Sequence, residues 1–279
     1  MPEKHDVSCD SEFLKLLTRD SNVDLMRAAL EISRDVLTEL NFEHVLSWIA
    51  ERGREIACRI RPGDDEISAL QELVHCLAVQ QGICGNAEAY NRVESSFPSR
   101  VIETGSGIPI SLCLLYQAVG EKAGINLEGV AAPHHFLLRC ETLVGPVIVD
   151  PYHRGRTFTI DECVSWLQQE TGMMSSQIRR SLYPASQRTI IIRMLNNLKI
   201  QFVENEDWEH AWMMQHRLTA LQPASYFERI DLATISLKAN HPGQALELFR
   251  SCLKSCPPDD AGLLKEQIQE ANNKLALWN

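Results

Sequence analysis

The stretch from Gly107 to Tyr152 constrains the fold more than any other part of the chain. It begins with an apolar run at helical spacing, and Pro109 suits the first turn of that helix because its missing N–H costs no hydrogen bond there. Three shorter apolar runs follow, at 126–131, 135–140 and 144–149. Short apolar runs separated by turn residues are typical of strands. The stretch therefore predicts one helix followed by a small antiparallel sheet.

Two polar residues flank the last two apolar runs. If these runs form a hairpin centred on Thr142 and Leu143, His135 lies opposite Asp150. The two side chains then share one face of the sheet as a direct cross-strand pair. A carboxylate beside an imidazole fixes its tautomer and raises its basicity, which is the orienting half of a catalytic triad. The nucleophile should lie at the helix N-terminus, where the dipole favours an anion, and Ser111 is there.

A nucleophile on a helix, followed by a histidine and an aspartate at strand edges, resembles the transglutaminase-like superfamily, which is related to papain. The sequence motifs GIPISL, PHHFLLR and VDPY are similar to motifs of the bacterial SirB-type proteins and of the middle region of a vertebrate F-box protein. Three segments closer to the N-terminus, ALEISRDVL, QGICGNAEAY and SSFPSRVIETG, fit the same family. The match therefore covers roughly residues 25–165. The resemblance implies that Ser111, His135 and Asp150 occupy the positions of a Cys-His-Asp triad.

Four more residues are candidate binding residues because of this resemblance. Asn86 and Tyr90 match polar family positions, although they can equally serve to tie down a loop. His134 stands where the family usually has Gly, and Tyr152 where it usually has Phe.

Two function classes follow from a serine at the nucleophile position. Active transglutaminases and their peptidase relatives use Cys there, and Cys113 is about 200° around the helix from Ser111. A serine hydroxyl needs a fully assembled base and oxyanion site. We therefore predict a Ser-His-Asp remnant that is weakly active or inactive, in a protein that serves as an interaction protein. The alternative is an active hydrolase or acyl-transferase on a peptide or amide, using Ser111, His135 and Asp150. The two differ in whether Ser111 reaches His135 in an open cleft.

The whole chain is predicted to be α+β, with three parts. Residues 10–170 form the transglutaminase-like domain, as a helical layer (10–82) and a core with the small sheet (83–170). Residues 171–186 are polar and predict a linker, and residues 187–279 predict an all-α tail.

The tail contains an internal repeat. Leu198, Ala211 and Pro223 recur 34 residues later, as Leu232, Ala245 and Pro257. A 34-residue unit of two helices is similar to tetratricopeptide repeats. We therefore expect this tail to bind a protein or peptide partner, with a last helix over 262–278 as its cap.

Composition excludes several function classes. The formal net charge of −10 argues against nucleic acid and against an anionic membrane surface as partners. No apolar run approaches the roughly 18 residues of a membrane span. The nine cysteines are odd in number and contain no C-x-x-C pair, which indicates reduced thiols in the cytoplasm.

No cofactor and no metal are predicted. The chain has no phosphate loop or dinucleotide fingerprint. His134, His135 and His153 with Asp150 could in principle hold zinc, but their spacing is not that of a usual zinc motif. His153 also belongs to a small basic cluster with Arg154 and Arg156, which either contacts an acidic substrate or is a solvated loop.

Overall fold

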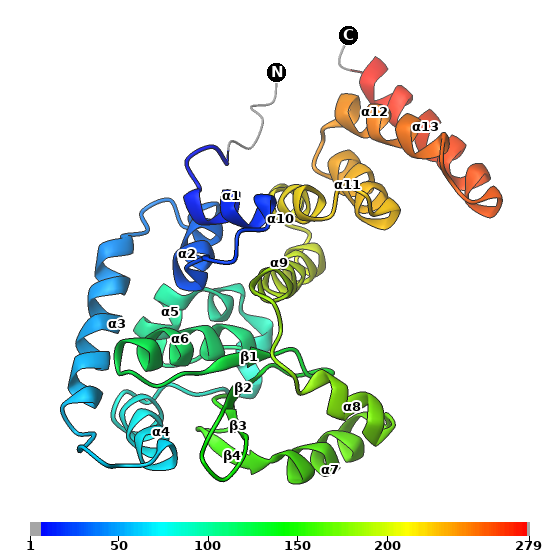
Figure 1. The fold of residues 1–279 in the computed structure, drawn as a ribbon. Helices are drawn as coiled ribbons and strands as arrows, with labels where there is room; N and C mark the ends of the chain where they lie inside the picture. The colour runs from blue at the N-terminus through cyan, green and yellow to red at the C-terminus, as the bar shows by residue number, and fades with distance from the viewer. Residues whose placement is uncertain (1–6, 278–279) are drawn as a thin grey trace. The chain divides into compact units, whose positions relative to one another are not determined.

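The computed structural model describes residues 7–277, and Figure 1 shows the course of the chain. The chain divides into two compact units, Ser21–Met194 and a second unit made of residues 7–20 together with 195–277. The helices of the first unit are α2 (Leu25–Arg34), α3 (Phe42–Ala57), α4 (Glu66–Val74), α5 (Pro98–Thr104), α6 (Pro109–Lys122), α7 (Ile160–Thr171) and α8 (Ser175–Ser181). A π-helical segment, His75–Gln80, continues α4, and two 3-10 helices, Ala87–Asn91 and Val93–Ser96, precede α5.

The helix starts follow local capping chemistry. Asp24 accepts a hydrogen bond from the Arg27 N–H at the start of α2, at 3.0 Å. Thr159 and Glu162 form a reciprocal capping box at the start of α7. Each of these contacts satisfies a backbone donor that the first turn of a helix leaves unpaired.

A four-stranded antiparallel sheet follows α6, in the order β1-β2-β3-β4. The strands are β1 (Glu128–Val130), β2 (Leu137–Cys140), β3 (Val147–Asp150) and β4 (Arg156–Thr159). The predicted antiparallel sheet and the α+β class are confirmed, and β4 is an additional strand that the sequence pattern did not indicate. Its RTFT sequence buries only Phe158, so it lacks the apolar run by which the other strands were recognised.

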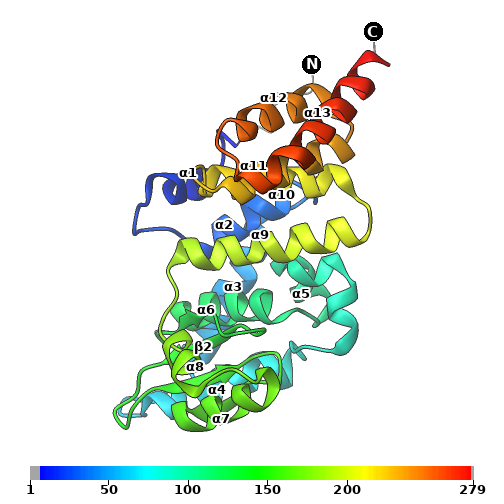
Figure 2. The ribbon, with the colours of Figure 1, turned by 90° about the vertical axis from the view of Figure 1, so that its right-hand side faces the viewer.

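Helices cover both faces of the sheet. One face carries an apolar cluster with α7 and α8, and its strand residues are Val130, Leu137, Ile148 and Phe158. Helix α6 contacts β1 and β2 and belongs to the opposite face. Figures 1 and 2 show α6 on one side of the sheet and α7 with α8 on the other. Because strand residues alternate in direction, this division decides which side chains can reach α6.

Helix α6 lies at the centre of its unit. Most of its residues are buried, so it is apolar around its whole circumference rather than along one stripe. Pro109 occupies its first turn, as predicted, and no side chain caps it.

The predicted linker is wrong. The segment over residues 171–186 contains α8, and two of its side chains, Ile178 and Leu182, are fully buried in the cluster beneath the sheet. The Ala185 N–H also donates to the Gly129 carbonyl at 2.8 Å, so the segment is hydrogen-bonded to β1. Its polar composition reflects the exposed side of a short helix. Two fully buried apolar residues, Ile178 and Leu182, are enough to pack the segment against the sheet.

The second unit is all helical. It contains α1 (Ser11–Thr18), α10 (Trp208–Leu221), α11 (Tyr226–Lys238), α12 (Pro242–Leu253) and α13 (Ala261–Ala276), with a 3-10 turn at Pro258–Asp260. Helix α9 (Gln187–Glu204) runs across the boundary between the units. Each of α10 to α13 contacts the next, and the repeated positions Leu198, Leu232, Ala211 and Ala245 are buried. The first two of these positions lie on α9 and α11, and the other two on α10 and α12. Residue 278 of the expected cap lies outside the described residues.

The first helix does not belong to the predicted N-terminal layer. Arg217 of α10 donates to the Asp10 carboxylate at 2.5 Å, and both side chains are buried. The same guanidinium lies 4.6 Å from the ring centre of Phe13. These contacts attach α1 to the helical tail. Among the helices of residues 7–277, none is long and apolar enough to cross a membrane.

The position of α8 gives a stability test. We expect Ile178→Ala to lower the free energy of unfolding by about 2–4 kcal/mol, because it removes a fully buried side chain. Met174→Ala, at a position 63% exposed just before α8, is the control and should change it by less than about 0.5 kcal/mol. Urea denaturation measures both. Equal, small effects would restore the linker interpretation.

Candidate functional site

His135 and Asp150 meet at one end of the sheet. The His135 Nε2 lies 3.0 Å from the Asp150 Oδ1, which confirms that the two side chains come within hydrogen-bonding distance. The predicted register was wrong by two residues, because the turn is centred on Leu143 and Val144 and Leu138 pairs with Val149. A shift of two residues keeps every side chain on its predicted face, whereas a shift of one would have reversed them all.

Asp150 is fully buried and accepts hydrogen bonds at both oxygens. Oδ1 accepts from His135 and from the backbone N–H groups of Tyr152 (3.1 Å) and His153 (3.4 Å). Oδ2 lies 2.6 Å from Nδ1 of His153. Burial raises the pKa of Asp150, but the hydrogen bonds and charges of His135 and His153 outweigh it, so the pKa lies below its ordinary value. The carboxylate is therefore ionised at neutral pH, and each imidazole must donate an N–H to it.

The turn before β2 holds the backbone of His135. The His135 N–H donates to the Ala132 carbonyl, and Nη1 of Arg193 donates to the same oxygen at 2.8 Å. The Arg193 guanidinium also lies over the ring of Phe136, at 5.7 Å from its centre. With Nε2 protonated toward Asp150, the neutral ring presents Nδ1 as an acceptor. This is the orientation that a general base requires.

Ser111 does not meet this base. Its hydroxyl is fully buried and lies 2.6 Å from the Ser95 carbonyl and 3.0 Å from the Ile108 carbonyl. Among the hydrogen bonds of the described residues, none connects Ser111 to His135. The reason is topological: Asp150 shares its sheet face with Ile148 and α7, whereas α6 belongs to the opposite face.

Cys113 is no substitute for Ser111. Its Sγ lies 3.5 Å from the Phe136 carbonyl, to which it donates, and the side chain is fully buried. Burial, and then the charge of Asp150, raise the pKa of the Cys113 thiol well above its ordinary value. The thiolate form that attacks a carbonyl is therefore disfavoured.

The predicted binding residues Asn86, Tyr90 and Tyr152 lie beside the pair. Asn86 uses its side chain internally, because Oδ1 accepts from the Ala89 N–H and Nδ2 donates to Ser106, each at 2.8 Å. The Tyr152 hydroxyl donates to the Asn86 carbonyl at 2.9 Å, and its ring lies 5.7 Å from that of Tyr90. Burial, with Tyr152 and Asp150, raises the pKa of Tyr90 to about 12, so it remains a neutral phenol at neutral pH.

His134 adopts a backbone conformation that favours glycine. Its φ is +55°, in the left-handed region, and its side chain is exposed. This conformation explains a Gly at this position in the resembled family, since Gly adopts it without a steric cost. His is among the residues that tolerate it better than most.

His135 lines an open pocket of about 300 Å³, whereas the fully buried Asp150 does not reach it. Its other walls come from Tyr90, Tyr152, His153 and Trp166, with Glu170 at the α7 side. Trp166 packs edge-on against His135, at 5.5 Å between ring centres. Sequence reasoning missed Trp166 and Glu170, because nothing before the fold is known places α7 over this face. It named His153 in a disfavoured zinc set and in a basic cluster, but it did not predict the hydrogen bond to Asp150 that the D-x-x-H spacing of the turn allows.

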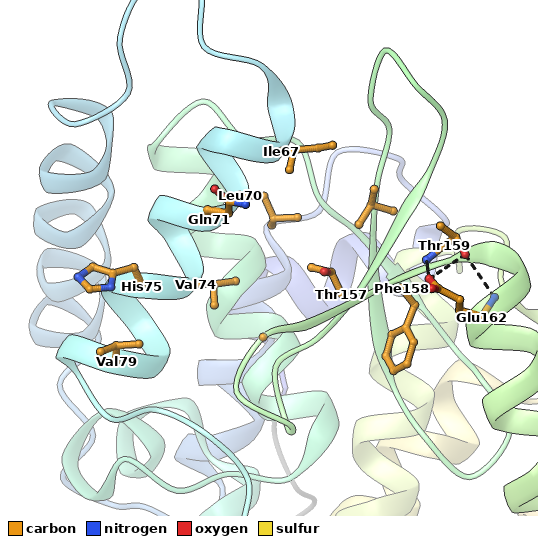
Figure 3. Close-up of a pocket in the computed structure, with 12 residues that line it drawn as sticks. Ile67, Leu70, Gln71, Val74, His75, Val79, Thr157, Phe158, Thr159 and Glu162 are labelled. Carbon is orange, nitrogen blue, oxygen red and sulfur yellow. Dashed lines mark hydrogen bonds between the residues drawn. The ribbon is translucent and has the colours of Figure 1, made fainter.

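A second cavity, of about 410 Å³, lies away from these residues. Figure 3 shows Ile67, Leu70, Val74 and Val79 on one side and Thr157, Phe158 and Thr159 on the other. The groove thus separates α4 and its π-helical continuation from β3 and β4. None of the predicted site residues lines it.

The comparison with known families decides the assignment. A family model described as the transglutaminase-like superfamily matches residues 43–196. The chain belongs to this superfamily. The matched region contains α6, the whole sheet and the His135–Asp150 pair.

Transglutaminase-like relatives occur in bacteria and in vertebrates. A UPF0162 protein of Xylella fastidiosa (strain Temecula1) is 28% identical over 244 residues, which cover 85% of this chain and 86% of that protein. Protein SirB1 of Salmonella typhimurium is 21% identical over 208 residues, covering 74% of this chain and 76% of SirB1. Mouse F-box only protein 21 is 26% identical over 163 residues, covering 55% of this chain and 25% of that protein. No solved structure matches. The predicted SirB-type relationship is confirmed.

Asp150 gives a pH-dependent test of the transglutaminase-like site. We expect Asp150→Asn to cost about 3 kcal/mol at pH 7, because two buried imidazole contacts lose their charged acceptor. The folded-state pKa lies below the ordinary value of 3.8, so the ionised carboxylate stabilises the fold above about pH 4, and this stabilisation is lost as the pH falls through the folded pKa.

The gap between wild type and Asp150→Asn should therefore be largest at neutral pH and narrow in acid. Urea denaturation at pH 7, 5 and 3.5 measures it. Asp161→Asn, at an exposed carboxylate, is the control and should show little change at any of these pH values. A gap that stays constant with pH contradicts the ionised pair.

Proposed function

We propose that this chain is a non-catalytic transglutaminase-like protein that binds a protein or peptide partner through its helical tail. The observation that carries the proposal is the position of Ser111, whose buried hydroxyl is directed at two backbone carbonyls. A serine nucleophile must instead lie within about 2.6–3.2 Å of its base. The cytoplasm is the expected location.

The retained half of the triad has a structural use that does not require turnover. Asp150 joins the entry of β2 to the turn after β3, through His135 on one side and His153 on the other. Buried ionised groups persist in proteins when such contacts compensate their lost hydration. The Ser-His-Asp set is thus interpreted as a remnant whose members serve the fold separately.

The tail offers surface for a partner. Phe227 in the first turn of α11 is 77% exposed, and Leu263 in α13 is 62% exposed. Stacked helices of repeat proteins form extended surfaces that bind partners, and these two side chains are apolar groups that a partner can cover there. In mouse F-box only protein 21 the similar region is a quarter of the protein, which fits a module that works beside other parts.

Ser111 variants test the catalytic half of the proposal. We expect Ser111→Ala to lower the free energy of unfolding by about 1–3 kcal/mol, because it removes a buried donor from the Ser95 carbonyl. Labelling by serine-directed activity probes should be the same in wild type and variant, with no adduct at residue 111 by mass spectrometry.

Ser111→Cys sharpens the same test. A thiol in this buried position should stay unreactive toward iodoacetamide at neutral pH in the folded protein, like Cys113 beside it. Rapid alkylation at residue 111 alone, or a probe adduct on Ser111 in wild type, would instead favour the active hydrolase or acyl-transferase.

Phe227 tests the binding half. With the full chain as bait in extract of the cells that express it, we expect Phe227→Asp to reduce the amount of a stoichiometrically captured protein by at least about 10-fold. Quantitative mass spectrometry, followed by titration with the purified partner, measures the loss. Leu143→Asp, at an apolar residue that is 89% exposed on the β2–β3 turn, is the control and should retain the partner. Capture that depends on Leu143 and not on Phe227 would move the binding surface away from the tail.

A further inference from the structure

Three side chains with metal-binding atoms converge at the end of β3. One ligand atom each from His135, Asp150 and His153 lies within 4.8 Å of the other two. Within residues 7–277 this is the one group of three or more His, Cys, Asp or Glu that meets this spacing. Each imidazole contacts a different oxygen of the same carboxylate, Nε2 of His135 at Oδ1 and Nδ1 of His153 at Oδ2.

We propose that His135, Asp150 and His153 form a binding site for a divalent transition-metal ion of the zinc type. Two imidazole nitrogens and one carboxylate oxygen are ligands that zinc accepts, and three protein ligands with an open position are usual where a metal binds an exchangeable molecule. The sequence argued against zinc because the three residues are not at motif spacing. Folding supplies the spacing, since the hairpin brings residue 135 to residue 150 and the turn brings residue 153 back to it.

The ligand atoms must rearrange to share one ion. Tetrahedral zinc with bonds of about 2.0–2.1 Å holds its ligand atoms about 3.3 Å apart. At present Nε2 of His135 lies 3.0 Å from Oδ1 and Nδ1 of His153 lies 2.6 Å from Oδ2, and one ligand atom from each of the three residues lies within 4.8 Å of the other two. The His153 side chain is 50% exposed, so it can move outward by the required distance without displacing core residues. On binding, the proton that each imidazole now donates to Asp150 moves to the other ring nitrogen or leaves to solvent.

The backbone around Asp150 selects the ligating oxygen. Oδ1 accepts the N–H groups of Tyr152 and His153, and it keeps these bonds when a metal replaces the imidazole contacts. Within the described part of the chain, the hydrogen-bond contact of Oδ2 is with the imidazole of His153, and Oδ2 becomes the single carboxylate ligand. Hydrogen bonds that orient a ligand from behind are characteristic of metal sites.

Both imidazole ligands, His135 and His153, line the pocket of about 300 Å³, so an ion bound between them has an open position toward it. The His153 side chain is 50% exposed, so solvent reaches the site from its side. Water or an oxygen atom of a small ligand fits this position. The site goes beyond the proposed function and does not depend on it, because the metal would link β2, β3 and their turn whether or not the tail binds a partner.

Metal binding to the full chain tests the site. After chelator treatment and dialysis, the protein is titrated with Co²⁺ under reducing conditions and then with Zn²⁺. We expect one equivalent of Co²⁺, the visible absorption bands of four-coordinate cobalt without a thiolate charge-transfer band, and displacement by Zn²⁺. We expect His153→Ala to weaken binding by more than about 100-fold, since loss of even an outer-shell contact costs 10–100-fold. His153 is exposed enough for this variant to fold, which circular dichroism verifies.

A control variant shows whether metal binding depends on the three proposed ligands or on another imidazole of the same pocket. His134→Asn changes an exposed imidazole in the same pocket and keeps a residue type that tolerates φ +55°. It should bind Co²⁺ as wild type does. Three outcomes overturn the proposal: no stoichiometric binding by wild type, binding that His153→Ala leaves unchanged, or binding that thiol alkylation abolishes, which would assign the metal to cysteines such as Cys252 and Cys256.

Discussion

The buried carboxylate of Asp150 is the contact on which the end of the sheet depends. An ionised carboxylate away from water is costly unless its lone pairs are used, and here four N–H groups use them. Two of these donors are backbone groups of the following turn, and two are imidazoles from different parts of the chain. The turn between β3 and β4 and the entry into β2 are thereby fixed by one side chain.

The contact between His135 and Asp150 could be predicted because it requires only that both side chains point to the same face of the sheet. It does not require the exact register of the hairpin. Placing the hairpin turn at Thr142 and Leu143, instead of at Leu143 and Val144, shifted the pairing by two residues. The alternation of side chains has a period of two, so His135 and Asp150 stayed on a common face. The long apolar run of α6 and its start at Pro109 were equally clear, since both follow from local preferences.

The position of Ser111 relative to this pair could not be predicted from such local signals. A helix N-terminus identifies where a nucleophile can be activated, but not which sheet face the helix crosses. The same limit explains why α8 and β4 were not predicted from the sequence. Their fixing contacts, such as Ile178 under the sheet and Phe158 stacked 5.1 Å from Trp166, involve single apolar residues in polar segments. Pattern methods need several periodic residues to register an element.

The geometry of His135 and Asp150 is therefore not by itself an indication of catalysis. The orientation of the imidazole follows from the Ala132 turn, from Trp166 and from a carboxylate that the backbone already holds. All of these persist whether or not a nucleophile lies opposite Nδ1. Ser111, near the start of α6, is the member that is not joined to the pair, because its hydroxyl is directed at two nearby carbonyls instead. In a transglutaminase-like core, the hydrogen bond of the nucleophile is thus the more informative observation, and the well-formed base is the less informative one.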